Sequence, residues 1–107
     1  MSECHDLKPG EILNSSHPQW PLLEGVIYAD ATLAYKLSKR LVCGIKHLPL
    51  RLRLSIITDT AKAIEAGVAH DPTLVVNGQL FIEGLVDTET ITAAFEHYLT
   101  TNSTEHY

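Results

Sequence analysis

The chain has 107 residues, the length of one ordinary domain, and its hydrophobic fraction of 45% excludes a disordered protein. Its net charge of −5 argues against a general nucleic-acid binder, and no apolar run is long enough to span a bilayer. Residues 1–13 contain acidic side chains and lack the apolar core of a secretion signal. We therefore expect a cytoplasmic protein whose partners include neither nucleic acid nor membrane.

The sequence divides into three parts. Prolines and small polar residues interrupt every pattern in residues 1–21, which predicts an irregular N-terminal leader whose Ile12, Leu13 and Trp20 contact the body. Residues 22–100 carry the regular patterns of one folded domain. The polar residues 101–107 are expected to form a flexible C-terminal tail.

The first half of the domain is predicted to contain two strands around a long helix. The apolar run Val26–Tyr28 is typical of a buried strand. A helix begins near Ala31, capped by Asp30 or Thr32, because apolar residues then recur at every fourth position: Leu33, Leu37, Leu41 and Ile45. Residues 50–56 alternate between apolar and polar and predict a strand, and the two arginines within it favour an edge position.

The second half is predicted to contain a short helix, a hairpin and a last helix. Asp59 can cap the short helix, and Gly67 can end it. Asn77-Gly78 between two apolar runs is a strong hairpin signal, because a type I′ turn needs positive φ at both central residues. Asp87 or Thr88 can cap the last helix. The predicted core comprises Val26, Ile27, Leu33, Leu37, Leu41, Leu54, Ile56, Ile64, Leu74, Val75, Phe81, Ile82, Ile91, Phe95 and Leu99.

One stretch of the second half has a family likeness. The segment IEAGVAHDPTLVVNGQLFIEGLVD, residues 64–87, resembles the small thioredoxin-like and glutaredoxin-like proteins of the redox-active disulfide type. The likeness extends over residues 25–99. It implies an α/β fold of the order βαβαββα, with a four-stranded mixed sheet of strand order 2-1-3-4 and helices on both faces.

The family's reactive residues are missing from this chain. Its members carry a Cys-x-x-Cys motif where the first strand meets the first helix, and Thr32 and Tyr35 occupy the matching positions here. A hydroxyl group cannot replace the thiolate that dithiol exchange requires, so redox activity does not follow from the resemblance. What the resemblance does imply is a cis Asp71–Pro72 bond and a binding cleft formed by Asp30, Thr32, Tyr35, His70, Asp71 and Pro72.

These observations favour a non-catalytic module that binds a protein partner. The contact would use the former active-site cleft or a sheet edge, and a second copy of the chain is one candidate partner. Structural explanations compete for the same residues. Thr32 can be a helix cap, Tyr35 can cover the cleft, and Asp71 can bond to nearby backbone groups.

A single-thiol redox or transfer protein is the alternative. Cys43 lies near cationic residues that favour a thiolate, namely Lys39, Arg40, Lys46 and His47. The nearby helix C-terminus opposes an anion, and a packed thiol is the commoner role of a lone cysteine. Two cysteines make a poor disulfide framework, and a reducing compartment would keep both as thiols.

Metal or small-ligand binding is a third hypothesis. The candidate ligands are Cys4 and His5, with His17 or the distant His106. Their spacing matches no metal-binding motif, and such sites need three or four convergent ligands. We therefore expect neither a metal nor a cofactor.

Overall fold

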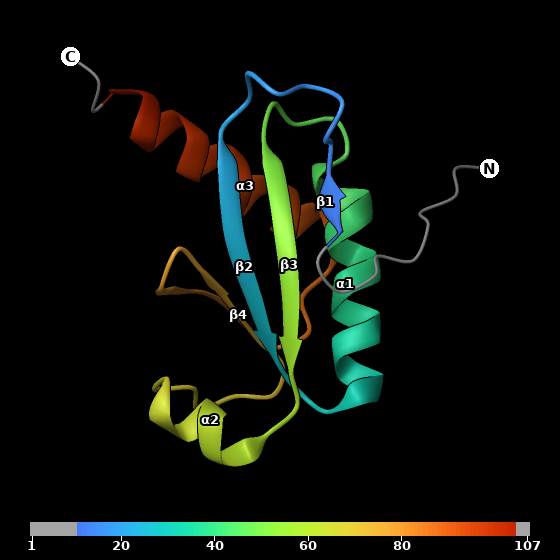
Figure 1. Ribbon diagram of the computed structural model, residues 1–107, viewed down its shortest axis with the longest axis vertical. Helices are drawn as coiled ribbons and strands as arrows, with labels where there is room; N and C mark the ends of the chain where they lie inside the picture. The colour runs from blue at the N-terminus through green and yellow to red at the C-terminus, as the bar shows by residue number, and fades with distance from the viewer. Residues whose placement is uncertain (1–10, 105–107) are drawn as a thin grey trace.

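The computed structural model describes residues 11–104, which form a mixed α/β domain (Figure 1). The predicted order of strands and helices in the body is confirmed, and one short strand precedes it. The elements are β1 (Ile12–Leu13), β2 (Leu22–Tyr28), α1 (Ala31–Ile45), β3 (Arg51–Ile57), α2 (Thr60–Glu65), β4 (Thr73–Val76), β5 (Gln79–Glu83) and α3 (Thr88–Thr104). No helix in this part of the chain is both long and apolar enough to cross a membrane.

The sheet has five strands in the order β1-β3-β2-β4-β5, where the sequence predicted four. β2 and β3 are parallel, and every other pair is antiparallel. The added strand, β1, comes from the predicted irregular leader and pairs only with Leu52 and Arg53. The prediction that residues 50–56 form an edge strand is therefore wrong, because β3 lies between β1 and β2.

Asn14 joins the leader to the body. It follows β1 with a φ of 61°, a backbone conformation that asparagine tolerates better than most residues. Its side-chain Nδ2 donates to three carbonyl oxygens at and after the end of α1, those of Ile45 at 3.2 Å, Leu48 at 3.3 Å and Leu50 at 2.9 Å. Leu13, next to it, is buried in the core, which confirms its predicted contact with the body, although it was not among the predicted core residues.

The core lies between one face of the sheet and the pair of helices α1 and α3. Strand residues alternate, so Leu23 and Ile27 point into the core, whereas Val26 points to the other face and is half-buried. The prediction that Ile64 belongs to the core is wrong: its side chain is 69% exposed, because α2 buries none of its residues. Helices were expected on both faces, but Figure 1 shows α3 behind β2 and β3, and α2 beyond the ends of these strands.

Three aspartates begin the three helices. Asp30 accepts from the backbone N–H of Leu33 at 2.8 Å, so Asp30 rather than Thr32 caps α1. Asp59 and Asp87 cap α2 and α3 in the same way, through the N–H groups of Ala61 and Thr90. These contacts satisfy donors that a helix N-terminus otherwise leaves open. The hairpin turn is also as predicted, with positive φ at Asn77 and Gly78.

Candidate functional site

The parallel pairing of β2 and β3 brings two helix starts together. Tyr28 and Ile57, the last residues of the two strands, are register partners. Directly beyond them, the N–H of Ala29 donates to the carbonyl of Ile57 at 3.2 Å. Each strand then leads into a capped helix, so Asp30 and Asp59 lie at the same edge of the sheet. Ligands of α/β proteins commonly bind at the carboxyl ends of parallel strands.

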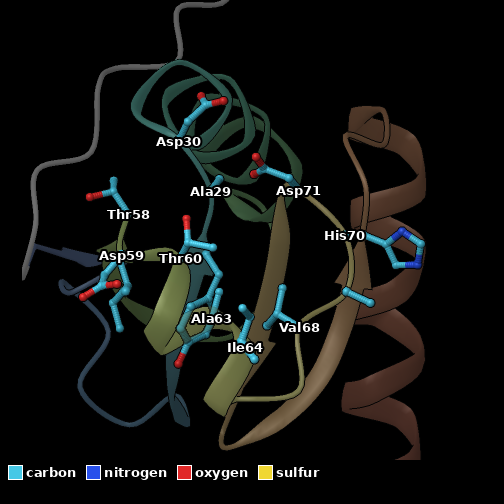
Figure 2. Close-up of a pocket in the computed structure, with 13 residues that line it drawn as sticks. Ala29, Asp30, Thr58, Asp59, Thr60, Ala63, Ile64, Val68, His70 and Asp71 are labelled. Carbon is cyan, nitrogen blue, oxygen red and sulfur yellow. The ribbon is translucent and has the colours of Figure 1, made fainter.

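A pocket of about 230 Å³ occupies this edge (Figure 2). Its apolar lining comes from the ends of β2 and β3 and from α2 with the loop that follows it: Tyr28, Ile57, Ala63, Ile64 and Val68. Figure 2 shows Ile64 and Val68 close together on one side of the pocket. The exposed Ile64 side chain therefore belongs to the wall of the pocket and not to the core.

Three carboxylates line the same pocket, those of Asp30, Asp59 and Asp71. Figure 2 shows Asp30 and Asp71 beside the start of α1, and Asp59 on the side of α2. Among the residues that the structure describes, no lysine or arginine lines the pocket. The site therefore combines an apolar wall with a negative rim. The caps at Asp30 and Asp59 also place negative charge where a helix N-terminus would otherwise attract anions.

The loop before β4 supplies the last part of the site. The Asp71–Pro72 bond is cis, as the family resemblance implied, and Pro72 is buried. The Thr73 hydroxyl donates to the carbonyl of His70 at 2.7 Å and fixes this loop. The His70 ring points away from the pocket in Figure 2, and its Nε2 lies 3.5 Å from Glu83 Oε1.

The structure gathers half of the predicted cleft residues. Asp30, His70 and Asp71 all line the pocket, whereas Thr32, Tyr35 and Pro72 are not among its lining residues. Tyr35 is 49% exposed on α1, with the Lys39 Nζ 5.5 Å from its ring centroid. It therefore does not cover the pocket.

Sequence reasoning missed the contribution of β3 and α2 to the site. Thr58, Asp59 and Thr60 line the pocket together with the apolar residues of α2. A signal for them was present, because two strands predicted to be parallel each precede a capping aspartate, and parallel strands end at the same edge.

The structure also bears on the other chemical hypotheses. Cys43 is half-buried and disulfide-bonded, so it is not the free thiol that the single-thiol hypothesis and the expected reduced state require. The only other cysteine of the sequence, Cys4, lies outside the described residues, as do His5 and His106. Within residues 11–104, no group of three potential ligands is placed to hold a metal ion. His17 instead stacks on Trp20, with ring centroids 3.8 Å apart.

No protein-family model matches the sequence, and a search of curated proteins finds no match to it.

Proposed function

We propose that this chain is a non-catalytic binding module of thioredoxin-like fold, whose acidic pocket holds an extended segment of a partner protein. The element order from β2 to α3 is βαβαββα. The strands β3-β2-β4-β5 follow the order 2-1-3-4 when the four body strands are numbered along the chain, and β1 adds to this arrangement. Both observations support the fold assignment.

The negative rim above an apolar wall is the observation that carries the proposal. A lysine or arginine side chain complements this combination of apolar wall and negative rim. Its aliphatic stem can cover the apolar surface while its cationic head stays near the carboxylates. The lining residues of the pocket offer Asp30, Asp59 and Asp71 for such a head. We therefore propose that the bound segment presents a basic side chain.

Hydrolytic and redox catalysis have less support from the same residues. Thr32 and Tyr35 offer no thiol. The hydroxyls of Thr58 and Thr60 line the pocket, but the His70 ring, the natural base for activating them, points away in Figure 2. The pocket therefore favours binding over bond cleavage.

The proposal is tested by titrating the ¹⁵N-labelled chain with three capped pentapeptides, identical except for a central lysine, norleucine or glutamate. We expect the lysine peptide to shift the amide signals of residues 57–71 and to bind more tightly than the norleucine peptide. We expect the glutamate peptide to bind most weakly. Equal binding of the three peptides, or shifts centred on α3, would contradict the proposed site.

Asp71→Asn is the decisive variant because Asp71 is exposed and caps no helix. Its control is Glu96→Gln, which removes one exposed carboxylate from α3, away from the pocket. Surface charge pairs are worth about 0.2–1 kcal/mol, so we expect Asp71→Asn to weaken binding of the lysine peptide by roughly 1.4- to fivefold. Glu96→Gln is expected to leave its affinity unchanged.

The absence of dithiol exchange is tested separately by insulin reduction with dithiothreitol. We expect no rate above the blank, because residues 32 and 35 lack sulfur. Clear turnover would refute the non-catalytic part of the proposal.

A further inference from the structure

One face of the sheet has no helix packed on it within the described residues. Strand residues alternate between faces, and α1 and α3 both contact the core face. Figure 1 looks onto the opposite face, where no helix crosses β2 or β3. We call this surface the open face. By strand register its residues are Ile12 of β1, Leu22, Glu24, Val26 and Tyr28 of β2, Arg51, Arg53, Ser55 and Ile57 of β3, Thr73 and Val75 of β4, and Leu80 and Glu83 of β5.

The middle of the open face is apolar. Val26 pairs with Val75 in the register of β2 and β4, and Val75 pairs with Leu80 in the hairpin. Leu80 is 47% exposed, Val26 and Tyr28 are half-buried, and Val75 is buried. Parallel strands such as β2 and β3 are normally covered on both faces. A partner on the open face would supply the second cover.

The two ends of the open face carry opposite charges. Arg51 and Arg53 lie toward the start of β3 and outnumber the one carboxylate beside them, that of Glu24. At the other end, Tyr28 and Ile57 border the pocket with its carboxylates, among them that of Asp71. A uniformly acidic or basic partner would therefore meet like charge at one end. A second copy turned by a two-fold axis, with its strands antiparallel to the first, places arginines over carboxylates at both ends.

We propose that the chain forms a two-fold symmetric dimer through the open face, with the arginine end of each copy over the acidic end of the other. Arg53 now pairs with Glu24 of its own chain at 3.1 Å, and both side chains are about half exposed. Such an exposed ion pair contributes little to the stability of the chain. Replacing it by a contact across the dimer therefore costs little free energy. The dimer shares Asp71, Tyr28 and Ile57 with the peptide site, whereas Leu80 lies outside the pocket and belongs to the open face alone.

Sedimentation equilibrium tests the dimer, with 11.8 kDa as the mass of one chain. We expect the average mass to rise toward twice this value with concentration, and to rise less at high salt, because screening weakens the end contacts. A mass of one chain at concentrations up to about 1 mM, the weak limit of specific association, would overturn the proposal. The pentapeptide titration is unaffected by that result, so the two proposals fail separately.

A charge exchange tests the orientation. In a dimer of two Arg53→Glu chains, carboxylates face each other at both ends. In a dimer of two Asp71→Lys chains, cations face each other at both ends. We expect each substitution to weaken association about tenfold. Mixing the two variants restores opposite charges at both ends, so the mixture is expected to associate as tightly as the unaltered chain. Lys36→Glu makes the same charge change as Arg53→Glu on an exposed position of α1, and is expected to have no effect.

Leu80→Lys tests the apolar middle without touching either charged end. We expect it to weaken the dimer at least tenfold, because a buried lysine lacks a counter-charge there, whereas Ala93→Lys on the exposed side of α3 is expected to have no effect. The amide spectrum of Arg53→Glu shows whether this variant folds. If it does not fold, the Leu80→Lys result by itself tests whether the open face is the dimer surface. Unchanged association in Leu80→Lys, or a mixture that stays as weak as its two components, would overturn the proposal.

Discussion

Replacing Asn14 by aspartate is expected to destabilise the domain more than removing the side chain altogether. The Nδ2 group of Asn14 donates to the carbonyls of Ile45, Leu48 and Leu50, at 2.9–3.3 Å. Aspartate has the same shape but turns an acceptor oxygen toward these three acceptors. Glycine keeps the positive φ of Asn14 without strain and leaves the carbonyls partly open to water.

The expected magnitudes follow from these contacts. Losing hydrogen bonds of a half-buried group costs about 1–2 kcal/mol, which is the expectation for Asn14→Gly. Asn14→Asp adds the repulsion between a carboxylate and the carbonyls of Ile45 and Leu50, so we expect a total of about 2–4 kcal/mol. For a domain of this size, each kcal/mol lowers Tm by roughly 4–8 °C.

Urea unfolding at pH 7 is the assay, followed by circular dichroism and by the fluorescence of Trp20, the single tryptophan. Asn77→Asp is the matched control. Asn77 also has a positive φ, of 50°, but its Oδ1 accepts from the N–H of Glu24, and aspartate keeps that bond. The Asn77 Nδ2 donates to the Tyr98 hydroxyl at 3.1 Å, and this hydroxyl can instead donate to an aspartate. We expect the control to lose less than about 1 kcal/mol. If Asn14→Asp proves as stable as Asn14→Gly, the amide does not hold the leader as described.

Three further substitutions probe the packing and the caps. Gly44→Ala is expected to destabilise by about 1–3 kcal/mol in urea unfolding, although alanine favours helices, because its Cβ would lie 2.9 Å from the Ile91 Cγ2. Ile64→Ser is expected to change stability by less than about 0.5 kcal/mol in the same assay, since Ile64 is 69% exposed on the pocket wall. The Asp87 carboxylate accepts hydrogen bonds from Thr90, from its side-chain hydroxyl first and its backbone N–H second, and these hold the pKa of Asp87 below its ordinary value of 3.8. The resulting stabilisation is fully present above 3.8 and is lost as the pH falls below 3.8 through the lowered pKa of the folded state. Asp87→Asn is therefore expected to be less stable at pH 7 and to lose less stability between pH 5 and pH 2.

Local chemistry allowed most elements to be predicted from the sequence. The four-residue spacing from Leu33 to Ile45 placed α1, and Asn77-Gly78 placed the hairpin, because each depends on residues close in sequence. β1 escaped prediction because it has two residues, and its pairing with Leu52 and Arg53 depends on a contact distant in sequence. Single short strands carry no periodic signal of their own.

The arginines of β3 show why an alternating pattern has two explanations. Arg51 and Arg53 alternate with buried leucines, which fits both an edge strand protected by charge and an interior strand with one uncovered face. The sequence favoured the edge, whereas β3 lies inside the sheet and its arginines belong to the open face. Only the neighbours of the strand distinguish the two cases.

The prediction for Ile64 failed for a related reason. In a helix of six residues, one apolar side chain does not define a face. Ile64 was assigned to the core because apolar residues usually lie there, but α2 lies beyond the strand ends and directs it to the pocket. Because Ile64 was assigned to the core, the pocket wall that α2 forms at the strand ends was not predicted.

The charge of the pocket follows from how the fold starts its helices. Because β2 and β3 are parallel, the helices that follow them begin at one edge, and each uses an aspartate to satisfy its first N–H groups. Asp30 and Asp59 therefore serve folding and site charge at once, and replacing either one changes both properties. Asp71 caps no helix, so it is the position where the charge of the site is separable from the stability of the fold. A loss of peptide affinity in Asp71→Asn at unchanged Tm would thus measure the electrostatic contribution alone, which neither capping aspartate allows.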